Sequence, residues 1–161
     1  MAKYIALTLL MIFTAACAAA PDDGAAPPDP AFALSYGDFL IYMGQDIEEV
    51  LEGLGEPLGI FEAPSCAFDG NDRIFRYPGM QIHTYPLDGN DFVHTIIIRD
   101  DSIAIHDGIR IGSDFDAVLA AYGDDYERDF DMYTYESGAA TLAFLVEDGY
   151  VSAITYGLIM E

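Results

Sequence analysis

Residues 44–55 read GQDIEEVLEGLG, and residues 112–123 read GSDFDAVLAAYG. Aligned without a gap, the two segments are identical at five positions. In each segment the apolar residues fall at i, i+3, i+4 and i+7, the spacing of one face of a helix. They are Ile47, Val50, Leu51 and Leu54 in the first segment, and Phe115, Val118, Leu119 and Tyr122 in the second. We therefore predict two short amphipathic helices.

The residues that flank each segment predict where these helices begin and end. Asp46 and Asp114 each precede a helix, where an aspartate side chain accepts a hydrogen bond from a free backbone amide. Glu49 would complete a capping box in the first segment. Gly55 and Gly123 stand where a helix ends in a left-handed residue. Helices of about two turns do not persist in water, so both need a surface to pack on.

Three strand-like runs with turn residues between them follow each predicted helix. Pro78-Gly79 suits a type II turn, and Asp148-Gly149 suits a tight hairpin, whereas residues 88–91 are expected to form a longer connection. Each half of the chain therefore reads as a helix and a three-stranded antiparallel meander. The predicted strands are residues 73–77, 80–85, 92–99, 131–135, 139–146 and 150–156.

These elements predict an α+β domain over residues 34–161, with one repeat at about 40–105 and another at about 106–161. The six strands should form one sheet that carries both helices on one face. The tandem pattern resembles the small bacterial lipoproteins of the SmpA/OmlA type, and it is similar to the tandem-repeat β-lactamase inhibitor proteins. The resemblance implies a curved sheet whose other face or loops bind protein.

The N-terminus has the pattern of an export signal. Residues 4–16 form an apolar or small-residue run behind Lys3. This run is shorter than the roughly 20 residues that span a bilayer, and it is typical of a signal peptide. The run ends in Thr-Ala-Ala before Cys17, which resembles the lipobox of bacterial lipoproteins, although Thr14 stands where that family usually has leucine.

The lipobox resemblance implies that residues 1–16 are removed and that Cys17 carries acyl chains such as palmitate. Two buried acyl chains anchor a protein stably to a membrane. The alternative is an ordinary secretory signal that is cut nearby. Residues 17–33 are rich in Pro, Ala and Asp, a composition typical of an extended spacer. We therefore expect an exported protein that is anchored by lipid to a bacterial membrane at the cell envelope.

The charge of the chain restricts its partners. Six Lys and Arg residues stand against 28 Asp and Glu residues, a net charge of −22. Such a surface repels the phosphates of nucleic acid and anionic lipid headgroups, so membrane attachment has to come from the lipid anchor. An envelope or extracellular protein is the partner that we expect. The simpler alternative is that the charge only keeps a tethered protein soluble.

His83 and His94 are the candidates for a metal site. If Tyr85 pairs with Phe92, the two imidazoles lie opposite each other with Cβ atoms about 5 Å apart. With a carboxylate from residues 88–91 they would provide three ligands. A shift of one residue in the strand register would remove this arrangement. We therefore assign no metal, no cofactor and no catalytic residue from the sequence.

Three other features have structural explanations that we favour. The tetrapeptide DGND occurs at residues 69–72 and 88–91, and it suits turns better than a calcium loop. Cys66 is flanked by apolar residues, which predicts a buried, unreactive thiol. The 11 Tyr and 10 Phe residues would either fill the core or form an exposed contact surface.

The sequence lacks the motifs of common hydrolases, phosphate loops and zinc proteases. We therefore predict a non-enzymatic binding or structural module of the cell envelope. The alternative is an envelope hydrolase or a metal-dependent enzyme with a site that the sequence does not reveal.

Overall fold

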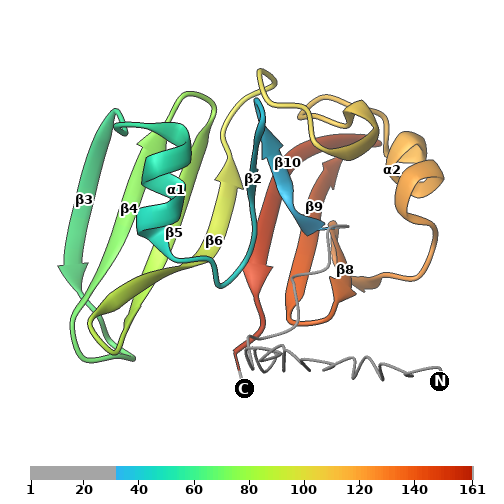
Figure 1. Cartoon of the computed structure of the whole chain (residues 1–161). Coiled ribbons are helices and arrows are strands. Elements are labelled where there is room, and N and C mark those ends of the chain that lie inside the picture. Colours follow the sequence, from blue (N-terminus) through green and yellow to red (C-terminus); the bar gives the residue numbers. More distant parts are fainter. Residues whose placement is uncertain (1–31, 161) are drawn as a thin grey trace, which may run out of the picture.

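The computed structural model describes residues 32–160, and most of its regular structure is β-strand (Figure 1). Eight strands form one antiparallel sheet in the order β3-β4-β5-β6-β10-β9-β8-β7. β6 pairs with β10 at the centre, which joins the two halves of the chain in one sheet. The strands are β3 (Gly59–Pro64), β4 (Asn71–Tyr77), β5 (Met80–Leu87), β6 (Asn90–Ile98), β7 (Glu127–Asp129), β8 (Met132–Ser137), β9 (Ala140–Glu147) and β10 (Tyr150–Leu158).

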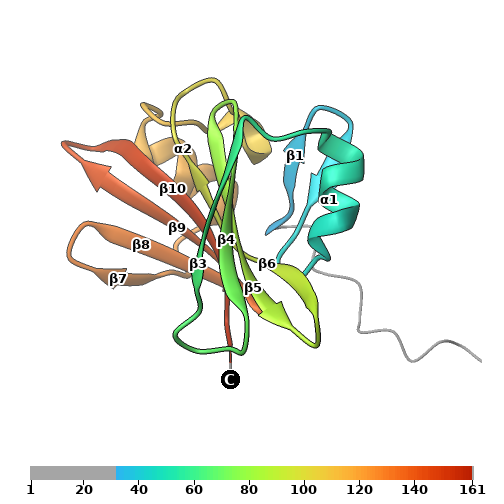
Figure 2. The same cartoon turned by 90° about the vertical axis from the view of Figure 1, so that its left-hand side faces the viewer.

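A second layer covers one face of this sheet. It contains α1 (Ile47–Leu54), α2 (Phe115–Tyr122) and a hairpin of β1 (Leu34–Tyr36) and β2 (Phe39–Ile41). Figure 2 shows α1 and the hairpin together on the same side of the sheet. The short 3-10 helix η2 (His106–Gly108) lies in the connection from β6 to α2.

The predicted fold class, an α+β domain made of two helix-plus-three-stranded-meander repeats, is wrong. The molecule is mostly β, with one eight-stranded sheet and only two α-helices among residues 32–160. Four strands follow each helix instead of three, and the β1–β2 hairpin adds a further element to the covering layer. The prediction failed at the sheet edges, because β3 is mainly exposed and β7 is only three charged residues long. Neither strand has the alternation of apolar and polar residues that identifies a half-buried strand.

The two predicted helices are present, and each begins at the expected aspartate. The Asp46 carboxylate accepts a hydrogen bond from the Glu48 amide at 2.9 Å, and Asp114 accepts one from the Asp116 amide at the same distance. Glu49 does not form the predicted capping box, because its carboxylate accepts a hydrogen bond from the Gln45 side chain at 3.5 Å.

Both helices end in the same way. Gly55 and Gly123 have positive φ angles of 77° and 81°, a conformation that glycine adopts without steric cost. The Tyr77 hydroxyl donates to the Gly55 carbonyl at 2.8 Å, and the Tyr135 hydroxyl donates to the Gly123 carbonyl at 2.9 Å. A tyrosine on the sheet therefore holds the end of each helix.

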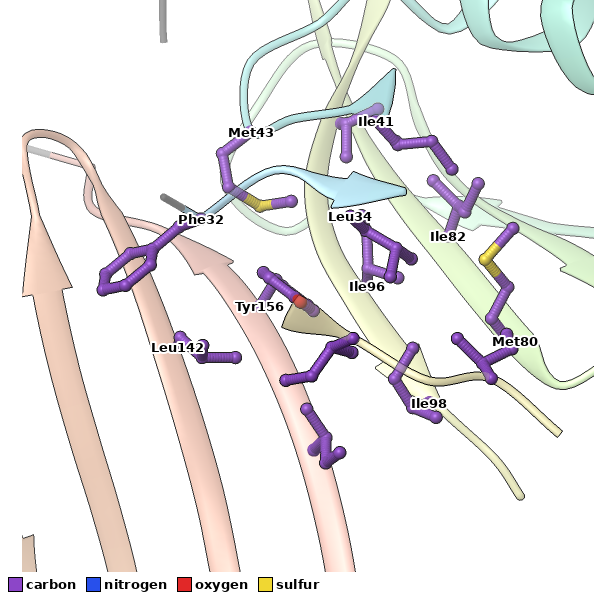
Figure 3. Packing of buried hydrophobic residues seen from close by; sticks show 14 of the residues in the cluster. Phe32, Leu34, Ile41, Met43, Met80, Ile82, Ile96, Ile98, Leu142 and Tyr156 are labelled. Atoms are coloured by element: carbon purple, nitrogen blue, oxygen red, sulfur yellow. The ribbon is translucent and has the colours of Figure 1, made fainter. Parts of the chain in front are cut away.

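The core lies between the sheet and the covering layer. Alternate side chains of β5 are buried, as expected for a strand with one covered face. Leu34 and Ile41 of the hairpin pack into the same cluster (Figure 3). Ile47 and Val50 of α1 and Val118 of α2 belong to it as well. One continuous core therefore extends beneath both helices and the hairpin.

The turn after β5 is tighter than predicted. Leu87 pairs with Asn90, so Asp88 and Gly89 form a two-residue turn in which both φ angles are positive, at 52° and 87°. The turn at Asp148-Gly149 has nearly the same angles, 52° and 86°. Both are hairpin turns of the kind that Asp-Gly favours.

No helix within residues 32–160 is long and apolar enough to cross a membrane. The predicted signal peptide, Cys17 and most of the predicted spacer lie outside the described residues, so the export signal and the lipid anchor remain predictions. The predicted spacer ends at residue 33, and within it Phe32 is already buried in the core.

Candidate binding site on the open face of the sheet

The face of the sheet that turns away from both helices has no described element packed over it. We call it the open face. Phe61, Ile74, His83 and Thr95 lie side by side across β3, β4, β5 and β6 on this face. Their neighbours along the strands, such as Phe75 and Ile82, point into the core.

A pocket of about 360 Å³ lies on the open face over β3, β4, β5 and β6. Much of its wall is apolar or aromatic. The Phe68 and Tyr85 rings lie 5.1 Å apart between centroids, and the His94 ring meets the edge of Tyr85 at 6.1 Å. Phe61 is 60% exposed and Met160 is 46% exposed. The residues that we use below to define this open-face pocket are Phe61, Ala63, Phe68, Ile74, His83, Tyr85, His94 and Met160.

The pocket brings His83 and His94 together, although not in the predicted pairing. Tyr85 does pair with Phe92, but a β-bulge after His83 shifts the register and places His83 opposite Thr95. The His94 Nδ1 atom lies 3.2 Å from the Thr95 hydroxyl oxygen. The sequence-based geometry of two directly opposed imidazoles is therefore wrong, because the bulge supplies the single-residue shift that removes it.

His83 is the polar group of this pocket that lacks a partner. Its Nε2 atom is buried and has no hydrogen-bond partner among the described residues. Burial, and secondly the charge of the neighbouring His94, lower the pKa of His83 below its ordinary value. A neutral imidazole can donate or accept one hydrogen bond at Nε2, depending on its tautomer. His83 therefore leaves one polar atom without a described partner in the wall of the pocket, where this atom has almost no accessible surface.

The two histidines are not joined by a third protein ligand. Within residues 32–160 there is no group of three or more His, Cys, Asp or Glu side chains that could hold a metal ion. Asp91, from the predicted carboxylate group, instead forms an ion pair with Arg73 at 2.5 Å. His106 lies away from this pair, in η2, where its ring contacts Tyr122.

The loop from β3 to β4 forms one side of the pocket. The Ser65 hydroxyl accepts hydrogen bonds from the Ala67 and Phe68 amides at 3.4 and 3.3 Å. These bonds order the loop, and the Phe68 ring packs on Tyr85. Cys66 is exposed, so the prediction of a buried thiol is wrong. The apolar neighbours in the sequence were misleading, because the loop turns Phe68 inward and leaves Cys66 outside.

A second pocket, of about 260 Å³, lies on the opposite side of β3, between that strand and α1. We call it the helix-side pocket. Ile47, Leu51 and Phe75 form its apolar floor. At its border the Arg73 guanidinium pairs with Glu62 at 3.1 Å as well as with Asp91. β3 therefore has a pocket on each of its two faces.

The other half of the open face has a different surface. Over β8, β9 and β10 it carries mainly small side chains, which are Thr134, Thr141, Ala143, Thr155 and Gly157. All five are only partly exposed. The sequence did not reveal the pocket, because Phe68 and Met160 are brought to it from outside the strands and have no periodic pattern.

Comparisons with known proteins provide no family for this chain. No family model matches it, and no curated protein matches it. The crystal structure of an extracellular protein containing a SCP domain from Bacillus anthracis is similar at a TM-score of 0.43 and 13% sequence identity. The match covers 71% of this chain and 43% of that chain, so this chain corresponds to less than half of the longer protein. A likeness at this level carries no argument about function.

Proposed function

We propose that this chain is a non-enzymatic binding module of the bacterial cell envelope, anchored to a membrane by lipid on Cys17. Its partner would be an envelope or extracellular protein that contacts the open face over β3, β4, β5 and β6. The observation that carries the proposal is the open-face pocket, whose wall combines exposed apolar side chains with His83 and His94.

The composition of this surface supports a protein partner. Protein interfaces are enriched in aromatic residues and Met and depleted of acidic side chains at their centre. Phe61, Phe68, Tyr85 and Met160 line this pocket, and Asp72 is the one acidic residue among its lining residues in a chain that has 28 of them.

A metal-dependent enzyme is the second candidate. The specific observation in its favour is that His83 and His94 line one pocket, with a buried nitrogen of His83 left unbonded. Two imidazoles would leave open positions on a zinc ion for water and substrate. Isothermal titration of the chain with Zn²⁺, compared with His83→Ala, distinguishes the two functions. Stoichiometric binding that His83→Ala abolishes would favour the enzyme.

The anchor is tested by separating membranes from soluble material in cells that express the full chain. Cys17→Ser should move the protein out of the membrane fraction and abolish incorporation of labelled palmitate. Cys66→Ser is the matched control, because it removes the other cysteine and should leave both readouts unchanged. Membrane association that persists in Cys17→Ser would refute the lipid anchor.

Binding through the open face is tested with the Cys17→Ser chain as a soluble bait in envelope extract. A captured protein should be lost when Phe61→Ser or Tyr85→Ser is introduced. The matched control is Thr155→Ala, because Thr155 lies on the same face in β10. Capture should persist in this variant. Capture that survives both pocket variants would contradict the proposed contact surface.

A further inference from the structure

We infer that the outer edge of β3 is a docking site for an extended segment of the partner protein, in which apolar and acidic residues alternate, and that this segment adds to the sheet as a ninth strand. The inference rests on the proposed function, because it assumes that the partner is a protein. β3 ends the sheet on one side, and no described strand pairs with its outer edge (Figures 1 and 2).

Along β3, alternate residues form backbone hydrogen bonds with β4, and the residues between them have N–H and C=O groups that remain free of described partners at this edge. The Ser65 amide donates to the Gly70 carbonyl at 3.0 Å, and Phe61 pairs with Ile74 further along the same ladder. Because the pattern alternates between antiparallel strands, Phe61 directs its backbone groups toward β4. Ile60 and Glu62 therefore direct theirs outward. A partner strand would find two N–H and two C=O groups there.

The side chains of this edge are unusually apolar for a free strand. Leu58 is 73% exposed, Ile60 is 55% exposed and Phe61 is 60% exposed. The opposite edge of the sheet, β7, has only Glu127, Arg128 and Asp129. Short, charged edge strands prevent pairing with other chains, whereas long apolar edges invite it. By this criterion the chain protects β7 and leaves β3 open.

Among the described residues, Arg76 is an unpaired cation at the same edge, and it indicates that the partner segment has acidic side chains. Arg76 pairs with Gly59, and a Cβ atom at Gly59 would lie 2.7 Å from the Arg76 Nη2 atom. The missing side chain thus allows the guanidinium to lie beside β3 on the open face. Arg76 has no ion pair within residues 32–160, while Arg73 already pairs with Glu62. Arg76 therefore offers one positive charge at this edge, unpaired in the described part of the chain, to an acidic side chain of the partner.

The two pockets explain why both kinds of side chain are expected in the partner. Alternate residues of an added strand would point to opposite faces of the sheet. One set would reach the helix-side pocket, which Ile60 and Glu62 border, and the other set would reach Phe61 and Arg76 on the open face. A second copy of this chain is the alternative occupant, which sedimentation distinguishes from a partner segment.

The probe is a fluorescent ten-residue peptide in which Val and Asp alternate, and its binding to the soluble Cys17→Ser chain is followed by anisotropy. Glu62→Pro removes an outward N–H group and leaves the ladder to β4 intact. Glu62→Gln removes the same carboxylate but keeps the N–H group, so it is the matched control. We expect Glu62→Pro to bind about tenfold more weakly than Glu62→Gln, the size of one net hydrogen bond. Thermal unfolding of both variants verifies that they are folded.

The charge requirement is tested with Arg76→Gln, which we expect to weaken binding of this peptide by up to about fivefold, the range of an exposed ion pair. Arg110→Gln changes the net charge equally at a distant exposed site and should leave binding unchanged. A version of the peptide that is N-methylated at every residue should not bind, because it has no N–H group to donate to the free edge of β3.

Three results would overturn the edge inference. These are equal binding by Glu62→Pro and Glu62→Gln, binding of the N-methylated peptide, and sedimentation of the chain as a dimer that Glu62→Pro dissociates. The first two exclude strand pairing, and the third assigns the edge to a second copy. The proposed function fails separately, if no envelope protein is captured in a manner that depends on Phe61 or Tyr85.

Discussion

The half of the molecule that contains α1 and β3–β6 differs from the half that contains α2 and β7–β10 in its surface far more than in its frame. Each helix begins at an aspartate cap and ends at a glycine whose carbonyl accepts a tyrosine hydroxyl. Each half also ends with an Asp-Gly hairpin turn. Only the first half combines the open-face pocket with a long apolar edge strand.

Two groups of aromatic residues illustrate this difference, while each half has both buried and exposed aromatic side chains. In the second half, Tyr122 of α2 packs on Tyr135 and Phe144 in the core, at centroid distances of 5.5 and 5.7 Å. In the first half, Phe61 and Tyr85 lie on the open face instead. Core filling therefore accounts for many of the aromatic residues, and a contact surface remains a proposal for those on the open face. The two halves of this single sheet thus differ in the side chains that they place on the open face.

The largest expected effect is a difference in the free energy of unfolding between variants of a buried and of an exposed phenylalanine. Phe144→Ala should lower the free energy of unfolding by about 3–5 kcal/mol, because it empties a fully buried ring position. Phe61→Ala should change it by less than about 0.5 kcal/mol, as for an exposed position. Chemical denaturation measures both. Comparable losses in the two variants would refute the division into core and contact aromatics.

High pH should destabilise the protein through two core tyrosines of the second half. Burial, with smaller contributions from Asp107 and Tyr135, raises the pKa of Tyr122 to about 12, and burial also raises the pKa of Tyr135 to about 12. Because the unfolded pKa is near 10, this stability is complete below pH 10 and is lost as the pH rises toward 12. The loss should be on the order of 2 kcal/mol per group. Tyrosinate absorbance followed together with denaturation tests this, and Tyr135→Phe should remove part of the pH dependence.

The helices provide a third comparison, at the aligned positions Gly53 and Ala121. A Cβ atom at Gly53 would lie 2.3 Å from the Phe39 ring of the hairpin. Gly53→Ala should therefore destabilise the protein by about 1–3 kcal/mol through overpacking, although alanine favours helices. Ala121→Gly should cost about 1 kcal/mol through helix propensity. If thermal unfolding shows that Gly53→Ala stabilises the chain, the packing of the hairpin on α1 is wrong.

The smallest expected effects come from the tyrosine hydroxyl that binds the end of the helix in each half. Tyr77→Phe and Tyr135→Phe each remove one hydroxyl that donates to a glycine carbonyl at a helix end. Each should lower the free energy of unfolding by about 1 kcal/mol. Near-equal values from urea denaturation at neutral pH would support equivalent roles. A loss in one variant alone would show that the helix ends are held differently.

Periodicity predicted the elements that bury one face and failed where burial is absent. The apolar spacing identified both helices, and alternation identified six of the strands in the large sheet. β3 and β7 were missed because an edge strand without a covered face has no alternation to detect. This omission, together with the unpredicted hairpin, made the predicted fold class wrong.

The candidate site was predictable only in part. The sequence singled out His83 and His94, which do line one pocket. It could not reveal the β-bulge that places His83 opposite Thr95 instead of His94, because a bulge depends on the backbone of two strands at once. The burial of Cys66 was also misjudged, since the direction of a loop side chain follows from tertiary contacts.

The claim that contacts are concentrated on the first half of the open face is tested most directly by photo-crosslinking in intact cells that express the full chain. A photoreactive phenylalanine derivative would replace either Phe61 of β3 or Thr155 of β10. These positions lie on the same face in different halves of the sheet. We predict a discrete protein adduct from position 61 and none from position 155. Adducts of equal yield from both positions, or from position 155 alone, would contradict the account.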